Sequence, residues 1–408
     1  MRFIIQQMRK PFILLLILLV IILTACNTTP TSPTQTPLPP APITATATET
    51  AAPTDTPFPT PTPTVTPVPT LQLSLFNDDA LKAQVDQLAA DFLKDTRDAG
   101  VSIAIVKRDP LTGQLRTMLL NYGVMSKDTK QPVTSDTVYE IGSITKVFTG
   151  ILLAKAINDG KASLDDPLQN YLPLGNKAPS YDNIPITLAN LATHRSSLPR
   201  DFGSDDMQEL YNWLNTLRID HAPGSEYVYS NVGYELLGDI LARLYGSDFG
   251  TLEFQSVSKP LGMLDTTETL SSDQEDRLAQ GYDYYGSGAP YFPEAGAMGP
   301  AGYLHSTLHD MAIFLVANMQ PESTPLAPAI KLAQVSEAQG RNPGTGAGLG
   351  WNMDHPNTPY ERIWKDGATN GFSSYISFVR DGSSGFVLLA NGQYIDNLAS
   401  DMIQLLGE

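Results

Sequence analysis

The order of hydrophobic and polar residues divides the 408-residue chain into three unlike parts. The first part contains an almost unbroken apolar run, FILLLILLVIIL, at residues 12–23. Residues 27–70 are almost entirely Thr, Pro, Ala and Ser, a composition that neither buries a core nor forms regular backbone hydrogen bonds. From about residue 71 to residue 408, apolar positions recur with the spacings of helices and strands. We therefore expect one folded part over 71–408.

This folded part has strands near both of its ends and helices in its middle. Helical spacing over 78–98 is followed by two strand-like runs, at 101–106 and 114–123, around the turn DPLTG. Two more strand-like runs, at 373–379 and 385–392, stand near the other end, before a last helical segment. This order predicts an α/β fold of the α+β kind, in which a mostly antiparallel sheet built by the chain ends is flanked by helices. A helical region is inserted into that sheet.

The segment EIGSITKVFTGILLAKAINDG, at 140–160, predicts a helix that is apolar nearly all the way round. It carries Ser143 and, three residues later, Lys146, so both side chains lie on one face. Ser143 is expected near the helix N-terminus, where free N–H groups favour developing negative charge. A lysine buried there has a lowered pKa and can accept or relay a proton. The alternative is a capping serine with a snorkelling lysine, and the SVSK stretch at 256–259 shows that the bare pattern also arises by chance.

Two further short motifs could serve a nucleophilic serine, which needs a base, an oxyanion hole and substrate contacts. In YSN, Tyr229 beside a lysine could ionise below its usual pKa of about 10 and act as the base. Asn231 of the same motif is alternatively a plain helix N-cap. In KDG, Lys365 and Gly367 stand at the predicted start of a strand, where glycine allows close approach of a substrate backbone. A solvated strand-end lysine is the alternative for that motif.

The histidines do not suggest a serine–histidine–aspartate site, because none lies in a recognisable catalytic motif and the chain has no G-x-S-x-G elbow. The five are His194, His221, His305, His309 and His355. The pair at 305 and 309 has metal-ligand spacing, but no third ligand motif supports it, so we favour a surface or structural role. No metal or organic cofactor is expected.

In order and spacing, the S-x-x-K, Y-x-N and K-x-G motifs resemble those of the penicillin-recognising serine hydrolases. They are most similar to the class C β-lactamase family with its esterase and D,D-peptidase relatives. The segments IGSITKVFTG, LATHRSSLP and YSNVGYELLG also look like family segments, and the resemblance covers about 80–406. It implies a β-lactamase/transpeptidase-like fold and an acyl-enzyme mechanism.

The resemblance also implies a role for each motif residue. Ser143 would be the acylated nucleophile, Lys146 its activating partner, and Tyr229 the general base that relays the proton to the leaving group. The backbone N–H groups of Ser143 and Ala368 would form the oxyanion hole. Whether Lys146 or Tyr229 takes the proton stays open, since the two can titrate as a unit.

For substrate binding, the resemblance implies that Asn231 contacts a substrate amide and that Lys365, with Gly367 beside it, polarises the base and attracts anionic groups. Asp366 departs from the family pattern, which usually has threonine or serine there to help bind a substrate carboxylate. Because an aspartate would repel a carboxylate or compete for Lys365, we expect ester or amide hydrolysis of neutral or cationic substrates, with slow β-lactam hydrolysis. Loops over 201–218 and 281–299 are candidates for setting specificity.

The rival hypothesis from another functional class is a non-catalytic cell-surface binding protein that uses the same fold. An inactive descendant has no chemical reason to retain the serine, the tyrosine and both lysines together, which argues against this alternative.

Composition and net charge narrow the choice of partners. The chain is 42% hydrophobic, enough for a sizeable core, and its formal charge is −17. The only clustered bases before residue 80 are Arg2, Arg9 and Lys10. A role that neutralises phosphates is therefore excluded, and we expect a small-molecule or peptide substrate rather than nucleic acid.

The single cysteine, Cys26, directly follows the apolar run. That run is shorter than the roughly 20 residues of a membrane-spanning helix and suits a signal peptide. It ends in LTAC, which resembles a bacterial lipobox. We therefore expect a lipoprotein signal peptide over 1–25, lipidation of Cys26, a disordered Thr/Pro-rich tether over 26–70, and an extracytoplasmic, membrane-anchored hydrolase domain over 71–408. An uncleaved anchor over 3–23 is the alternative.

Overall fold

The computed structural model describes residues 71–291 and 295–408. The expected signal peptide, the tether and Cys26 lie outside the described residues. Within the described ranges, no helix has the length and apolar character needed to cross a membrane.

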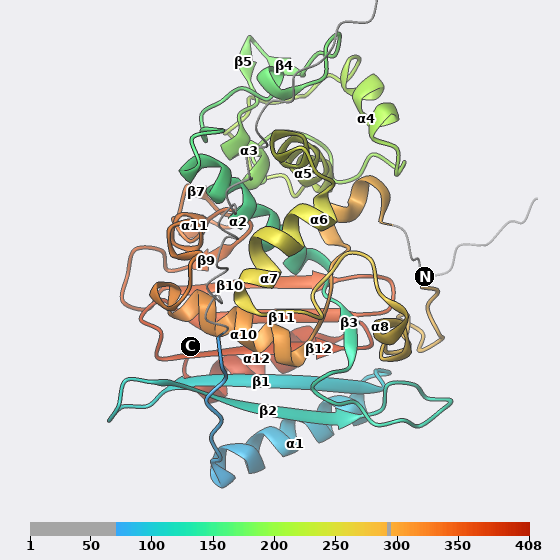
Figure 1. The fold of residues 1–408 in the computed structure, drawn as a ribbon, viewed down its shortest axis with the longest axis vertical. Helices are drawn as coiled ribbons and strands as arrows, with labels where there is room; N and C mark the ends of the chain where they lie inside the picture. Colours follow the sequence, from blue (N-terminus) through green and yellow to red (C-terminus); the bar gives the residue numbers. More distant parts are fainter. Residues whose placement is uncertain (1–70, 292–294) are drawn as a thin grey trace, which may run out of the picture. The chain divides into compact units, whose positions relative to one another are not determined.

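An eight-stranded antiparallel sheet in the order β2-β1-β12-β11-β10-β9-β8-β7 forms the framework (Figure 1). Its strands are β1 (Gly100–Arg108), β2 (Leu115–Gly123), β7 (Ala338–Gln339), β8 (Thr345–Ala347), β9 (Asn352–Asp354), β10 (Arg362–Ala368), β11 (Ser373–Val379) and β12 (Ser384–Ala390). The first and the last long strand of the described residues meet in the pairing of β1 with β12, where Val101 lies opposite Ala390. The predicted fold class is confirmed, because the sheet is antiparallel, is built by the chain ends and is flanked by helices.

Two small antiparallel pairs stand apart from this sheet. They are β3 (Val138–Glu140) with β6 (His305–Thr307), and β4 (Ser180–Tyr181) with β5 (Ile184–Pro185). In the first pair Glu140 lies opposite His305.

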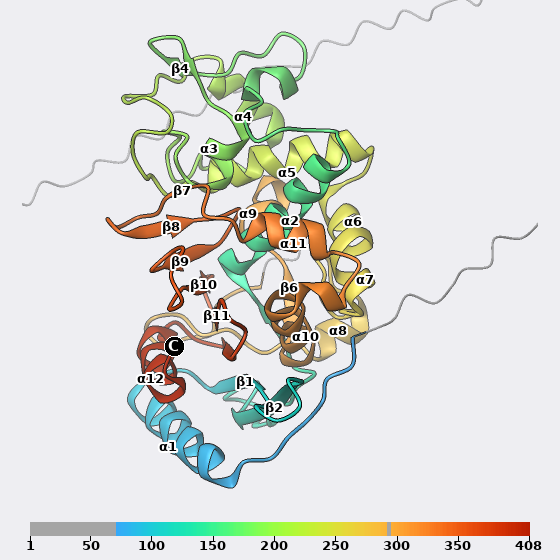
Figure 2. The ribbon, with the colours of Figure 1, turned by 90° about the vertical axis from the view of Figure 1, so that its left-hand side faces the viewer.

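Helices cover both faces of the sheet, as Figure 2 shows: α1 (Asp79–Asp95) and α12 (Ile395–Leu406) lie on one side, and α10 (Leu308–Met319) lies on the other. Strand β1 is buried without interruption from Gly100 to Val106 because alternate residues enter two different cores. Ile103 and Ile105 pack toward α1 and α12, whereas Ala104 and Val106 belong to the larger core on the α10 side.

The remaining helices include the region inserted beyond the β7 end of the sheet (Figure 1). They are α2 (Thr145–Asn158), α3 (Leu188–Ala192), α4 (Met207–Leu214), α5 (Asn231–Tyr245), α6 (Phe249–Glu253), α7 (Lys259–Leu261), α8 (Ser272–Asp276), α9 (Gly299–Gly302) and α11 (Ala327–Ala333).

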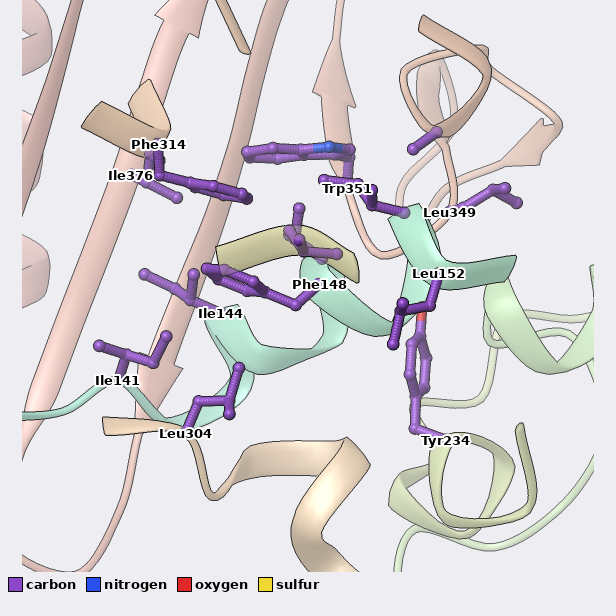
Figure 3. Close-up of a cluster of buried hydrophobic side chains, with 14 of the residues drawn as sticks. Ile141, Ile144, Phe148, Leu152, Tyr234, Leu304, Phe314, Leu349, Trp351 and Ile376 are labelled. Carbon is purple, nitrogen blue, oxygen red and sulfur yellow. The ribbon is translucent and has the colours of Figure 1, made fainter. Parts of the chain in front are cut away.

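Helix α2 passes through the larger core, which explains why it is apolar on nearly every side. Phe148 stacks on Phe314 of α10 with ring centroids 4.2 Å apart, and Figure 3 shows the same cluster continuing to Trp351 and to Ile376 of β11. On another side of the helix, its residue Leu152 belongs to this core as well, together with Tyr234 of α5. The first helix is shorter than predicted, since it ends at Asp95 rather than residue 98.

Helix α2 is held very close to the segment Gly348–Trp351. A Cβ on Gly150 would lie 2.0 Å from the backbone oxygen of Leu349, and a Cβ on Gly350, whose φ is +87°, would lie 2.5 Å from the backbone oxygen of Lys146. Side chains at either glycine would push the helix away from this segment, so glycine sets the depth of α2 in the core.

The fold predicts that Gly150→Ala destabilises the protein by about 1–3 kcal/mol, because the backbone of Leu349 has to move. Gly233→Ala in α5 is the matched control, since its Cβ would meet nothing closer than 3.4 Å and alanine favours a helix. Urea denaturation of both variants measures the effect. Equal stabilities for the two variants would contradict the close approach.

Candidate active site

Ser143 lies in a single 3-10 turn, Gly142–Ile144, that leads directly into α2. The expected position near a helix N-terminus is therefore correct. Gly142 has a φ of +50°, and a Cβ on it would lie 2.6 Å from the backbone nitrogen of Ala368. The serine turn is thus pressed against the end of β10, and a residue with a side chain at 142 would separate the two.

Lys146 is completely buried one turn later, which excludes the snorkelling alternative. Its Nζ lies 2.8 Å from Oδ1 of Asn231, 2.5 Å from the backbone oxygen of Ala301 and 3.2 Å from Oγ of Ser143. Burial lowers the pKa of Lys146, and the charge of Lys365 lowers it further, while Tyr229 opposes the shift. The predicted direction is therefore confirmed.

Tyr229 brings its hydroxyl to 2.6 Å from Oγ of Ser143. Three cations surround its ring: Nζ of Lys146 at 4.9 Å from the centroid, Cζ of Arg200 at 5.1 Å and Nζ of Lys365 at 5.6 Å. Burial opposes ionisation of the phenol, but the charges of Lys146 and Lys365 more than offset it and lower the pKa of Tyr229 to about 8.

Two proton arrangements satisfy this cluster. The oxygens of Asn231 and Ala301 can only accept, so Lys146 donates two N–H groups to them in either form. With a neutral amine, the lone pair of Lys146 accepts the proton of Ser143 while Tyr229 donates to Oγ. With an ammonium, Lys146 donates its third N–H to Oγ while Ser143 donates to a phenolate at Tyr229. Both arrangements hold the same number of protons, so the two groups titrate as a unit.

Asn231 opens α5 but does not cap it. The hydroxyl of Ser230 accepts the N–H of Gly233 at 3.0 Å and serves as the N-cap, so the plain N-cap alternative for Asn231 is wrong. The amide group of Asn231 instead donates from Nδ2 to Oδ1 of Asp201 at 2.6 Å, which fixes its oxygen toward Lys146.

Lys365 stands in the middle of β10 and not at the start of a strand, which corrects the prediction. The strand begins at Arg362 because three of its residues, 362–364, pair with the short strand β9. Lys365 is only 3% exposed and its Nζ lies 2.9 Å from Oδ1 of Asp366. Burial would lower the pKa of Lys365, but the Asp366 carboxylate and Tyr229 raise it, so the ammonium is retained. The predicted competition of Asp366 for Lys365 is present as an ion pair.

The backbone N–H of Ala368 faces the serine turn. Thr369 donates its N–H to the backbone oxygen of Phe372, the residue before β11, at 3.0 Å. Hydrogen-bonded pairs alternate along antiparallel strands, so the N–H of Ala368 points away from β11. Gly367 packs against the same turn, since a Cβ there would lie 2.2 Å from the backbone oxygen of Ile141. This close packing gives Gly367 a steric reason to be glycine, while its substrate contact stays a prediction.

His194 contributes to the site, although its sequence context indicated no catalytic motif. Its ring stacks on Tyr229 with centroids 4.3 Å apart, its Nδ1 accepts the N–H of Ser230 at 3.1 Å, and its backbone oxygen accepts the N–H of Val228 at 2.8 Å. It therefore holds the residues on both sides of Tyr229. Burial lowers its pKa, so the imidazole is neutral.

The other histidines do not share in these contacts around Tyr229. His305 is buried while His309 is half-exposed beside Asp310. Among the residues that the structure describes, no three His, Cys, Asp or Glu side chains are arranged to hold a metal ion.

Two hollows meet at Ser143, which lines both. One, of about 240 Å³, is lined by Glu140, Asn231, Tyr303 and residues 368–372. The lining of the other hollow, of about 500 Å³, includes Ser143, Ala368, Arg200, Tyr227, Tyr229, Arg341, Trp364, Lys365 and Asp366. The candidate loop 281–299 contributes Ala289, Pro290 and Met298 to the first hollow.

With this geometry established, comparison with known proteins identifies the family. The protein-family model described as Beta-lactamase matches residues 85–406. The chain belongs to the β-lactamase family. It is accordingly an enzyme of the serine hydrolase class.

Individual β-lactamase-family relatives agree with this assignment. A β-lactamase of Pseudomonas fluorescens is 30% identical over 350 residues, which cover 77% of this chain and 94% of that protein. The D-alanyl-D-alanine-carboxypeptidase/endopeptidase AmpH of Escherichia coli K12 is 40% identical over 153 residues, 35% of this chain and 40% of that protein. The crystal structure of the D-alanine carboxypeptidase AmpC from Burkholderia cenocepacia superposes with a TM-score of 0.71 at 30% identity, covering 81% of this chain and 99% of that one.

For this β-lactamase-family site, the charges around Tyr229 predict that its phenol ionises near pH 8. Lys365→Met removes a nearby positive charge and should therefore raise the pKa of Tyr229 by about one unit or more. Tyrosinate absorbance, measured as wild type minus Tyr229→Phe, isolates this group. Lys161→Met, which removes a lysine beside Tyr245, is the control and should leave the titration unchanged. A titration that is insensitive to Lys365 would contradict the electrostatic account.

Proposed function

We propose that the protein is an acyl-enzyme hydrolase that cleaves ester or amide bonds with Ser143 as its nucleophile. One observation carries the proposal: Oγ of Ser143 lies within hydrogen-bond reach of both Nζ of Lys146, at 3.2 Å, and the hydroxyl of Tyr229, at 2.6 Å. A serine flanked by two groups that can exchange a proton without a change in their total charge is suited to attack a carbonyl carbon.

In the first half of the reaction, Oγ of Ser143 forms a bond to the carbonyl carbon of the substrate and gives its proton to the Lys146–Tyr229 pair. The N–H groups of Ser143 and Ala368 hold the developing oxyanion, a contribution of roughly 3 kcal/mol to the barrier. Tyr229 then passes the proton to the leaving group as the bond to it breaks. This leaves the acyl group on Ser143.

In the second half, a water molecule repeats the same steps in reverse. The Lys146–Tyr229 pair takes a proton from the water as its oxygen forms a bond to the acyl carbon. The bond from that carbon to Oγ of Ser143 then breaks, the pair returns the proton to Oγ, and the carboxylic acid is released. Asn231, fixed between Lys146 and Asp201, supports the amine throughout and is placed to contact a substrate amide.

The substrate class follows from Asp366. The relatives named above are β-lactamases and D-alanyl-D-alanine carboxypeptidases. In this chain the side chain of Asp366 is 54% exposed and forms an ion pair with Lys365, and both residues line the same hollow as Tyr229. A substrate carboxylate would meet this charge instead of a hydroxyl. We therefore infer ester or amide hydrolysis with a neutral or cationic leaving-group side, and slow turnover of β-lactams and D,D-peptides. No observation favours the non-catalytic alternative.

We also propose how the chain is organised and where it works. Residues 1–25 would be removed as a lipoprotein signal peptide, Cys26 would carry the lipid, and 26–70 would tether the hydrolase domain, 71–408, to the membrane on its extracytoplasmic side. Support for this comes from the LTAC sequence and the Thr/Pro-rich composition.

Turnover of a p-nitrophenyl ester and of a carboxylate-bearing chromogenic cephalosporin tests this function. We expect Ser143-dependent ester turnover that Ser143→Ala abolishes, together with a slow or trapped cephalosporin adduct. Asp366→Thr should raise the preference for the cephalosporin over the ester by about tenfold or more, since the like charge is replaced by a donor.

Asp366→Glu is the matched control because it keeps the charge, and it should leave the preference near that of the wild type. Rapid cephalosporin turnover by the wild type would refute the argument from Asp366. Ester turnover that survives in Ser143→Ala would refute the assignment of the nucleophile.

A further inference from the structure

The smaller hollow beside Ser143 is lined by an acidic residue, Glu140, that the mechanism above does not use. Glu140 ends β3, three residues before Ser143, and both line this hollow. Burial raises the pKa of Glu140 and the hydroxyl of Thr369 lowers it, but no cation among residues 71–291 and 295–408 offsets the burial. A half-buried carboxylate without a positive partner is ready to bind one.

The two hollows have different roles in the proposed reaction. Tyr229 lines the larger hollow together with Lys365 and Asp366, and it does not line the smaller one. A leaving group must reach Tyr229 to be protonated, so it occupies the larger hollow. The acyl group, on the other side of the scissile bond, then occupies the smaller hollow and faces Glu140.

The walls of the smaller hollow also suit a cation. Tyr303 and Phe372 line it, and aromatic faces attract positive charge. Burial raises the pKa of Tyr303, and the nearby charges of Glu140 and Asp205 raise it further. Arg200 is the arginine that lines this hollow, and it already forms an ion pair with another carboxylate: its Nε lies 3.4 Å from Oδ2 of Asp201.

The smaller hollow borders another one, of about 310 Å³, with which it shares Ala289, Pro290 and Phe372. That neighbour is lined by Glu275 and Asp276 and by no lysine or arginine of the described residues. A positive charge on a longer acyl chain therefore continues to meet negative potential as it extends away from Ser143.

We propose that Glu140 determines acyl specificity by binding a protonated amine on the acyl group, so that the enzyme prefers esters or amides of amino-bearing acids over their neutral isosteres. The proposal rests on the function proposed above, because it needs Ser143 as the acylated residue and the larger hollow as the leaving-group side.

Two pairs of p-nitrophenyl esters test the proposal: β-alanyl against butanoyl, and δ-aminovaleryl against hexanoyl. In each pair an ammonium replaces a terminal methyl group. At mildly alkaline pH we expect kcat/KM to favour the cationic member of at least one pair by about tenfold or more, after subtraction of the rate with Ser143→Ala. Glu140→Gln should abolish this preference while turnover of the neutral esters is retained. Asp366→Asn, on the leaving-group side, is the control and should keep the preference.

The outcomes separate the two proposals. Neutral esters turned over by Ser143 with no cationic preference, or with a preference that Glu140→Gln leaves intact, would overturn the role of Glu140 and leave the hydrolase standing. Loss of Ser143-dependent turnover of every ester would overturn the function itself. If Glu140→Gln does not fold, inhibition of the wild-type enzyme tests the proposal instead. Propylammonium should compete with the butanoyl ester, whereas propanol should not. Equal inhibition by both compounds would contradict the proposal.

Discussion

The architecture around Ser143 depends on the burial of one amine. Lys146 is surrounded by oxygens of Ser143, Asn231 and Ala301 and is removed from water completely. Placing a charge in such a position is costly, and the cost is what lowers the pKa of Lys146 and couples its proton to Tyr229. The neighbours must supply acceptors at fixed positions, because an unsatisfied buried amine would destabilise the fold by several kcal/mol.

Those acceptors come from elements that are far apart in the sequence. Ala301 belongs to α9, Asn231 opens α5, and Asp201 holds the Asn231 amide in place. Close backbone contacts bring the pieces together, since glycines at 142 and 150 let α2 and its leading turn approach β10 and Leu349. The chemistry of the site is therefore built from packing on all sides of one helix.

The features that could be predicted from the sequence are those with a local pattern. Strands β1, β11 and β12 appear where nearly continuous apolar runs predicted them, because both faces of that part of the sheet are covered. The shared face of Ser143 and Lys146 also followed from their spacing alone. Burial of Lys146 followed from the apolar residues around the helix.

The features that the sequence did not reveal depend on distant contacts or on the backbone. Lys365 was expected at the start of a strand, because the short strand β9 that pairs with the beginning of β10 has too weak a pattern to be recognised. The contribution of Ala301 is a backbone oxygen, which no residue type signals. His194 acts through its stacking on Tyr229 and its hydrogen bond to Ser230, and its backbone φ of +58° is not readable from LATHRSSLP.

The central claim is that Lys146 and Tyr229 form one proton-sharing unit that makes Ser143 reactive. The most direct measurement is the rate at which a fluorophosphonate labels Ser143 in the wild type, Lys146→Met, Tyr229→Phe and the double variant. If the two act as a unit, each single change lowers the rate by about a thousandfold or more, and the double variant is hardly slower than either. Losses that multiply in the double variant would show that the two groups act independently and would contradict the account.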